Sequence, residues 1–254
     1  MNQKNCLFHV MNSSDVAPNS FVTALNDLPA QYRNVVRIAG GCGEMEPQEV
    51  AAVNEYFKTA FEGFGGILFS GGTAKYNKED GGRNFMVTEL PITLAEGNSN
   101  IKVLGSFPRT EIFRLTGSDQ GQANLLFNDN NIDPEKTYLD APDARYDELL
   151  AVQKNVNKLL DWDGDLEVYF NLMDTWRQGG AKTCIVTYNG GGVTYKEALK
   201  AIEDGHKLIV INGSGRKSDE LAATYLTNEH KNVFVADIKD AQTLRAGLKW
   251  AEIL

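Results

Sequence analysis

The chain has 254 residues, of which 42% are hydrophobic, 9% aromatic and 23% charged. This composition excludes intrinsic disorder and the collagen-like and proline-rich classes, and a chain of this length can bury a core without disulfides or metal ions to hold it. The formal net charge of −9 argues against a general attraction to nucleic acids or anionic lipids, so local groups must hold any anionic ligand.

Cysteine and histidine are scarce, with three of each, and none has the spacing of a zinc site. An odd number of cysteines argues against a disulfide framework. The chain does not start with a basic segment followed by an apolar run, and no apolar stretch approaches the ~18 residues of a membrane-spanning helix. We therefore expect a reduced, cytoplasmic protein that binds no nucleic acid, membrane, metal or other cofactor.

The first half of the chain alternates short apolar runs with helical patterns. In chain order, the expected elements are a strand at residues 5–11, a helix at 17–28, a strand at 34–39, a helix opened by Pro47, and strands at 67–70 and 101–105. Residues 111–147 are polar, rich in Asn and Asp, and show no periodicity. Because a loop of this length is uncommon in a compact domain, we expect a flap or an insertion near the ligand edge.

The second half repeats this alternation more regularly. In chain order, the expected elements are helices at residues 146–160 and 165–177, a strand at 182–188, a helix at 194–203, a strand at 207–211, a helix at 218–226, a strand at 232–236 and a helix at 241–254. Continuously apolar strands that alternate with helices indicate a parallel sheet covered on both faces. We therefore predict an α/β fold, a Rossmann-like open parallel sheet with helices on both faces, as one domain over residues 1–254.

Glycine-rich loops follow four of the predicted strands. Because the carboxyl ends of parallel strands lie along one edge of a sheet, we expect these loops to form one ligand crevice, where glycine permits positive φ and close approach of a ligand. A single such loop is more simply a tight turn, but four together favour a ligand. The predicted ligand-binding residues are Gly40, Gly41, Cys42, Gly43, Gly71, Gly72, Thr73, Arg109, Asn189, Gly190, Gly191, Gly192, Thr194, Gly213, Ser214, Gly215 and Arg216.

Two charged side chains near these loops each have two interpretations. Arg216 stands at a helix entry beside a Gly-Ser-Gly turn and is either a solvated surface arginine or a bidentate phosphate clamp, which we favour. Arg109 is a second candidate for the phosphate. Glu197 follows Thr194 by three residues, a spacing typical of a capping box, but a carboxylate that points into the crevice is instead a candidate catalytic group.

Four segments carry a family resemblance: residues 35–43 (VVRIAGGCG), 67–73 (ILFSGGT), 189–198 (NGGGVTYKEA) and 210–222 (VINGSGRKSDELA). Together with Trp162-x-Gly164-Asp165, they resemble the SLOG superfamily over about residues 34–226. The branch that they resemble is the prokaryotic one akin to the N-terminal domain of melastatin-type TRP channels. The resemblance implies a Rossmann-like domain that binds a nucleotide-derived signal, since relatives bind ADP-ribose or cyclic ADP-ribose isomers.

We therefore expect a protein that senses or sequesters such a signal, in antiphage defence or as a phage-encoded sponge. A second SLOG branch, the cytokinin-activating hydrolases, carries Pro-Gly-Gly-x-Gly-Thr-x-x-Glu. In this chain Asn189 replaces the proline and Val193 the third glycine, while Glu197 is kept. The alternative is thus a nucleotide glycosidase or phosphoribohydrolase, in which Glu197 orients water or stabilises the ribosyl centre and Arg216 holds phosphate.

A third alternative is a scaffolding oligomer with a vestigial crevice. The apolar side chains of the closing helix, Leu244, Leu248, Trp250 and Ile253, offer some surface for it, although such a pattern more often packs in a core. We favour binding over turnover and expect a homo-oligomer.

Overall fold

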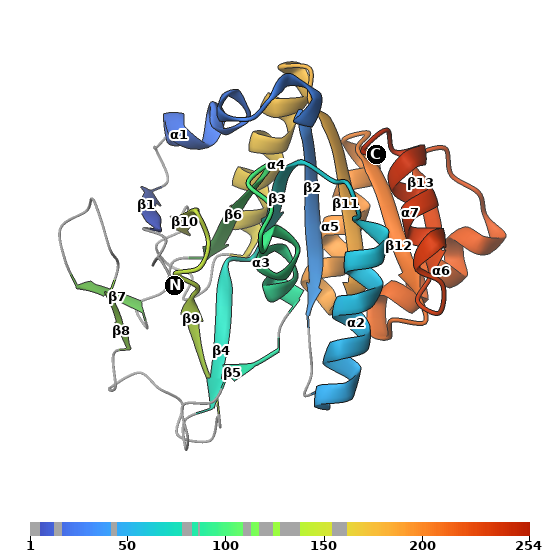
Figure 1. Cartoon of the computed structure of the whole chain (residues 1–254), viewed down its shortest axis with the longest axis horizontal. Helices are drawn as coiled ribbons and strands as arrows, with labels where there is room; N and C mark the ends of the chain where they lie inside the picture. The colour runs from blue at the N-terminus through green and yellow to red at the C-terminus, as the bar shows by residue number, and fades with distance from the viewer. Residues whose placement is uncertain are drawn as a thin grey trace.

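An eight-stranded parallel sheet forms the centre of the structure (Figure 1). The computed structural model describes residues 6–12, 17–41, 45–77, 83–85, 87–108, 113–116, 124–127, 138–153 and 162–254. The strand order is β1-β10-β6-β3-β2-β11-β12-β13, and every pair is parallel. The strands are β1 Leu7–Asn12, β2 Asn34–Gly41, β3 Gly66–Ser70, β6 Ile101–Pro108, β10 Glu148–Gln153, β11 Lys182–Asn189, β12 Lys207–Asn212 and β13 Val233–Asp237. The predicted fold class is confirmed.

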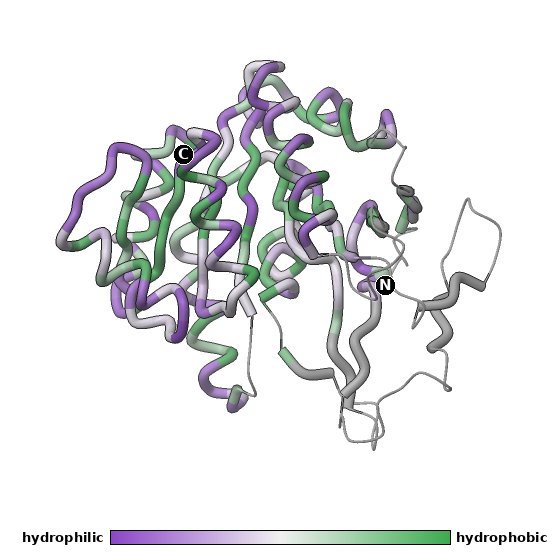
Figure 2. The backbone as a smooth tube through the Cα atoms, turned by 180° about the vertical axis from the view of Figure 1, so that it is seen from behind, coloured by the Kyte–Doolittle hydropathy of each residue, from purple (hydrophilic) through white to green (hydrophobic). Residues whose placement is uncertain are grey.

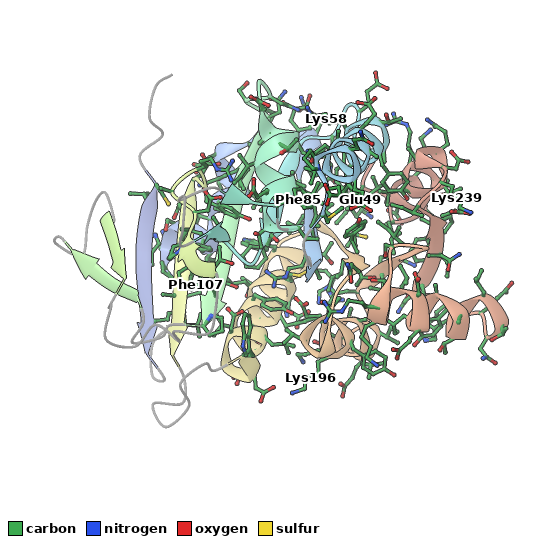
Figure 3. The ribbon with its side chains drawn as sticks, turned by 90° about the horizontal axis from the view of Figure 1, so that it is seen from below. Glu49, Lys58, Phe85, Phe107, Lys196 and Lys239 are labelled. Atoms are coloured by element: carbon green, nitrogen blue, oxygen red, sulfur yellow. The ribbon has the colours of Figure 1, made fainter. Side chains whose placement is uncertain are left out.

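Helices cover both faces of this sheet. On one face lie α2 Pro47–Ala60, α3 Leu90–Ala95 and α7 Ala241–Trp250, and on the other α1 Asn19–Val22, α4 Trp162–Gln178, α5 Gly192–Glu203 and α6 Arg216–Thr227. Seen from below, Lys58 of α2 and Lys196 of α5 lie on opposite outer sides of the sheet (Figure 3). The sheet therefore separates two hydrophobic clusters.

The helix starts and strand runs follow local sequence chemistry. Pro47 stands in the first turn of α2, and the backbone N–H of Glu46 donates to Glu49 Oε2 at 2.9 Å, which closes a capping box. β3 is buried at every residue, as a strand covered on both faces must be. Figure 2 shows the same arrangement as hydrophobic strands inside hydrophilic helix faces and turns.

One predicted element is wrong. Helical patterning was expected over residues 146–160, but Glu148–Gln153 is strand β10, which lies between β1 and β6. Leu149 and Ala151 face one hydrophobic cluster while Leu150 and Val152 face the other, so the middle of the segment is apolar on both faces. A short run of this kind does not distinguish a buried strand from a buried helix, and tertiary pairing decides the outcome.

Smaller sheets stand beside the main one. β4 Thr73–Asn77 pairs antiparallel with β5 Arg83–Asn84 and with β9 Tyr138–Pro142, and β7 Phe113–Thr116 pairs with β8 Asn124–Phe127. β7, β8 and β9 come from the segment 111–147, whose other parts lie partly outside the described residues. A flap in this segment stays a prediction.

Short helical turns complete the fold: η1 Ala24–Asp27, η2 Ala30–Tyr32 and η3 Val87–Glu89. The helix expected over residues 17–28 is therefore α1 followed by η1. Among the described helices, none combines the length and the apolar character needed to cross a membrane.

Candidate functional site

The sheet has a topological switch point between β2 and β11. From β2 the chain builds outward through β3 and β6 on one side, and from β11 through β12 and β13 on the other. In open α/β sheets, ligands bind outside the carboxyl ends of the strands at such a point. Gly41 ends β2 and is the register partner of Asn189, which ends β11, so two of the predicted glycine loops meet there.

The guanidinium of Arg216 lies over these two loops. A Cβ atom at Gly41 would lie 3.8 Å from Arg216 Nη1, and one at Gly191 would lie 2.9 Å from Nη2. Arg216 is exposed, and it forms no ion pair with any described residue. The end of β2 and the loops after β11 and β12 therefore converge on one accessible cation, which itself begins α6.

The backbone at this point takes conformations that side chains rarely adopt. Three described non-glycine residues have positive φ, and two of them, Asn189 at 56° and Arg216 at 50°, lie here. Each such residue costs about 1–3 kcal/mol and persists only where its surroundings impose it. The strain thus coincides with the converging loops.

Serine side chains fix the loops in this strained form. The hydroxyl of Ser214 accepts from the Asn189 backbone N–H at 2.9 Å and donates to the Ile211 carbonyl at 2.7 Å. Ser218 donates to the Asn189 carbonyl at 2.8 Å. The Oδ1 of Asn189 is buried, and it accepts no hydrogen bond from any described residue.

Some predicted residues pack rather than line an opening. A Cβ at Gly40 would lie 2.0 Å from the Tyr188 carbonyl oxygen, and one at Gly190 would lie 2.4 Å from Thr194 Oγ1, which is itself buried. Glycine is required at both positions because the backbone approaches these neighbours too closely for a side chain. Gly192 has open space around it, and Gly213 packs against Ile238.

The glycines of the second loop have neighbours other than Arg216. A Cβ at Gly72 would lie 2.5 Å from Leu149, and one at Gly71 would lie 3.1 Å from Thr88 of η3. Thr73 opens β4, and its carbonyl accepts from the Thr88 hydroxyl. This loop therefore leads into the small antiparallel sheet. Cys42, Gly43 and Arg109 lie outside the described residues.

The capping box expected at Thr194 and Glu197 is wrong. Helix α5 starts at Gly192 with Gly191 as its N-cap, two residues earlier than the pattern indicated. Glu197 therefore lies in the second turn, too far along to reach an N-cap N–H. The carboxylate is buried and accepts at Oε1 from Arg37 Nε at 3.2 Å and Nη2 at 2.9 Å. The expectation of a carboxylate free for catalysis does not match this geometry either.

Arg37, Glu197 and Tyr169 form a buried polar cluster between the sheet and the helices α4 and α5. The Tyr169 hydroxyl donates to Glu197 Oε1 at 2.6 Å, and Arg37 Cζ lies 3.8 Å from the Tyr169 ring centroid. Burial lowers the pKa of Arg37, but the Glu197 carboxylate and Tyr169 raise it by more, so the guanidinium stays charged. Burial, followed by Glu197, raises the pKa of Tyr169 well above its usual value.

One feature of the sequence indicates this cluster, although no motif includes it. Arg37 is the single charged residue within an apolar run, VVRIA, of a strand expected to be buried on both faces. A charge in that position needs a partner, because an unpaired buried charge costs several kcal/mol. Glu197 supplies the partner from a helix that follows the neighbouring strand.

Fold and site together define a Rossmann-like α/β protein with glycine loops at its switch point. Residues 147–248 match the model of the family described as "SLOG in TRPM, prokaryote", which confirms the resemblance to the SLOG superfamily. The match runs from β10 into α7 and includes the loops after β11 and β12. The similar segments at residues 35–43 and 67–73 lie before it.

Two solved structures are similar to this chain at low identity. A protein designated TM1055 is 17% identical with a TM-score of 0.50, and the alignment covers 85% of this chain and 98% of that one. The molybdenum cofactor carrier protein from Chlamydomonas reinhardtii is 14% identical with a TM-score of 0.46, covering 86% and 98%. The likeness to TM1055 concerns the fold alone. No curated protein sequence matches this chain.

Proposed function

We propose that the chain binds a nucleotide-derived signal at the carboxyl ends of β2, β11 and β12, and that the ligand is ADP-ribose or a cyclic ADP-ribose isomer. The observation that carries this proposal is the exposed, strained Arg216, whose guanidinium lies over Gly41 and Gly191. A guanidinium fork matches a phosphate or diphosphate group and binds it in a bidentate manner. The family match supports a ligand of the nucleotide class.

The surroundings of Arg216 suit an anion in two further ways. Helices α5 and α6 both begin at these loops, and the unpaired backbone N–H groups of a helix start favour phosphate. The whole chain carries a net charge of −9, so this local arrangement has to overcome a repulsive background. A ligand held by backbone groups and one arginine is therefore recognised by shape as much as by charge.

The proposed contacts fall into two groups. The backbone contacts are Gly41, Gly191, Gly192 and Gly215, and the side-chain contacts are Asn189 and Arg216. Gly40, Gly190, Gly213, Ser214 and Thr194 act by holding the loops in place. Gly71, Gly72 and Thr73 lead into the small antiparallel sheet and are not among the proposed contacts, and Cys42, Gly43 and Arg109 stay candidates from the sequence.

Binding without turnover is the form of this function that we propose. The Glu197 carboxylate, which the hydrolase alternative needs to act on ribose, is engaged by Arg37 and Tyr169. A protein that binds the signal without consuming it acts as a sensor or as a sequestering protein. Assembly into a homo-oligomer belongs to the same proposal, with the molar mass measured by sedimentation as its check.

The test is the identity and fate of the bound molecule. Purified protein is denatured, and the released small molecules are identified by mass spectrometry, before and after incubation with ADP-ribose and its cyclic isomers. The proposal expects an intact ADP-ribose-type ligand, recovered without free base or ribose phosphate. Release of base by the wild-type protein, abolished in Glu197→Gln, would support the hydrolase instead, and failure of every isomer to bind would reject the ligand class.

A further inference from the structure

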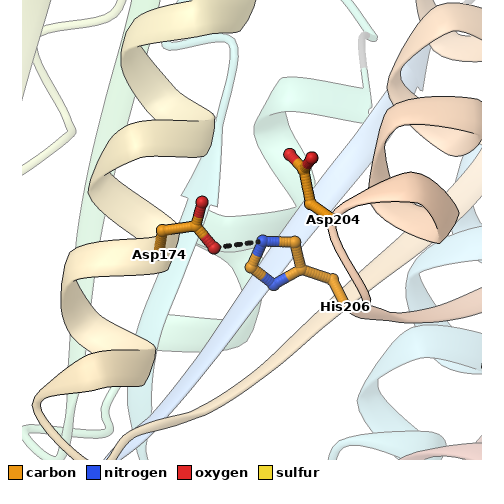
Figure 4. Close-up of side chains that lie close together, drawn as sticks. All are labelled: Asp174, Asp204 and His206. Carbon is orange, nitrogen blue, oxygen red and sulfur yellow. Dashed lines mark ion pairs between the residues drawn. The ribbon is translucent and has the colours of Figure 1, made fainter.

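A cluster of potential metal ligands lies away from the glycine loops, near the amino end of β12. Asp174 lies on α4, Asp204 follows α5 as its C-cap, and His206 directly precedes β12 (Figure 4). One ligand atom from each residue lies within 4.8 Å of the other two. The spacing of these residues in the sequence does not reveal the cluster, because they come from separate elements.

The end of α5 fixes two of the three residues. Gly205 takes a positive φ of 76°, its N–H donates to the Ile202 carbonyl, and the His206 N–H donates to the Ala201 carbonyl at 2.9 Å. This left-handed turn places Asp204 and His206 on either side of one glycine. Their relative position is thus set by the backbone rather than by the side chains.

The imidazole of His206 is held with one nitrogen toward the carboxylates. The side chain is fully buried, and Nδ1 lies 2.9 Å from Thr183 Oγ1, which orients the ring. Nε2 lies 3.2 Å from Asp174 Oδ1, yet at an angle that makes no hydrogen bond with any described residue. Metal-ligating histidines have this form, with one nitrogen tethered and the other directed at the ion.

Two cations already face the carboxylates and compete with any metal ion. Arg177 Nη2 lies 2.6 Å from Asp174 Oδ1, and Lys200 Nζ lies 2.9 Å from Asp204 Oδ2. All four of these side chains are partly exposed, and ion pairs of this kind are worth only about 0–1 kcal/mol each. A divalent ion with three protein ligands therefore displaces them at moderate cost.

We propose that Asp174, Asp204 and His206 bind a divalent transition-metal ion of the Zn²⁺ class and so fasten α4 to the turn between α5 and β12. A mixed set of imidazole and carboxylate ligands suits Zn²⁺ and its neighbours better than Mg²⁺. Donor atoms on one tetrahedral Zn²⁺ lie about 3.3 Å apart. Asp174 Oδ1 and His206 Nε2 already have this separation at 3.2 Å, so Asp204 is the ligand that has to move inward, by at most about 1.5 Å. Water completes the coordination from the exposed side.

The experiment is a Zn²⁺ titration of the full chain by calorimetry after treatment with a chelator, with Mg²⁺ as the contrasting ion. The wild type is expected to bind one Zn²⁺, and Asp204→Asn and Asp174→Asn are expected to weaken binding at least about tenfold. Glu203→Gln is the matched control, because it removes an exposed carboxylate one residue from Asp204 and outside the cluster.

Anomalous diffraction at the zinc edge locates the ion independently of the titration. A peak bounded by the three side chains, together with weakened binding in both aspartate variants and unchanged binding in Glu203→Gln, would establish the site. Absence of Zn²⁺ binding at micromolar concentration, equal affinities in Asp204→Asn and Glu203→Gln, or a peak elsewhere would overturn the proposal.

Discussion

Two arginines near the switch point of the sheet differ in burial, in backbone conformation and in the groups that surround them. Arg37 lies inside β2, buried, with Glu197 and Tyr169 against it. Arg216 lies at the start of α6, exposed, at a positive φ, and without an ion-pair partner among the described residues. The charge of Arg37 joins the sheet to a helix and is neutralised within the protein. The charge of Arg216, the proposed ligand contact, stays available to a ligand. The following predictions separate these two roles.

The largest effect is expected from Arg37→Met. The substitution leaves the Glu197 carboxylate buried without its cation, and breaking a buried pair in this way costs about 3–5 kcal/mol. Urea unfolding followed by circular dichroism measures the change. Arg33→Met, at an exposed arginine just before β2, is the control and is expected to stay within about 0.5 kcal/mol of the wild type. Similar small losses in both variants would show that the Arg37 pair contributes little.

The contact between β10 and the edge strand β1 is expected to make the free energy of unfolding depend on pH. Burial raises the pKa of Glu148, but hydrogen bonds from His9, Ser20 and Lys102 outweigh it and lower this pKa to about 2. Because the folded pKa lies below the unfolded value of 4.5, Glu148 contributes stability above pH 4.5 that is lost as the pH falls toward 2.

This contribution is about 2–3 kcal/mol. The measurement is the free energy of unfolding of wild type and Glu148→Gln between pH 6 and pH 2. The difference between the two proteins is expected to shrink across that range. A difference that stays constant would mean that Glu148 titrates normally in the folded protein.

The smallest effect concerns the backbone of Arg216. Arg216→Gly and Arg216→Ala both remove the guanidinium, but only glycine adopts a φ of 50° without strain. We expect the glycine variant to be the more stable by about 1 kcal/mol, measured as a difference in thermal unfolding. If the alanine variant were equally stable, the strained backbone would have to relax once the arginine is gone.

The sequence predicted the parts of the fold in which local pattern and tertiary position agree. β11 and β12 each differ by one residue from the apolar runs that indicated them, because both are buried strands flanked by glycine turns. β10 was mistaken for a helix because six apolar-rich residues fit either structure until β1 and β6 pair with them. β4 and β9 also form by pairing between segments that are distant in the chain, and no local sequence pattern indicates such pairing.

The candidate site was predicted in part for the same reason. Chain topology alone brings Gly41, Gly191 and Arg216 together, since parallel strands share one carboxyl edge. The surroundings of the Glu197 carboxylate were not predicted, because they depend on where α5 begins and on Arg37, a residue 160 positions away in the sequence. Because α5 begins two residues earlier than expected, Glu197 lies beyond the first turn and forms a buried ion pair instead of a cap.

The most direct test of the central claim is the affinity of Arg216→Ala for ADP-ribose or whichever cyclic isomer the wild type binds, measured by calorimetry. Loss of a charge-assisted contact worth about 1.5–3 kcal/mol is expected to weaken binding at least about tenfold, while circular dichroism shows an unchanged fold. Arg33→Ala is expected to bind as the wild type does. Unchanged affinity in Arg216→Ala would contradict the account and return Arg216 to an ordinary surface position.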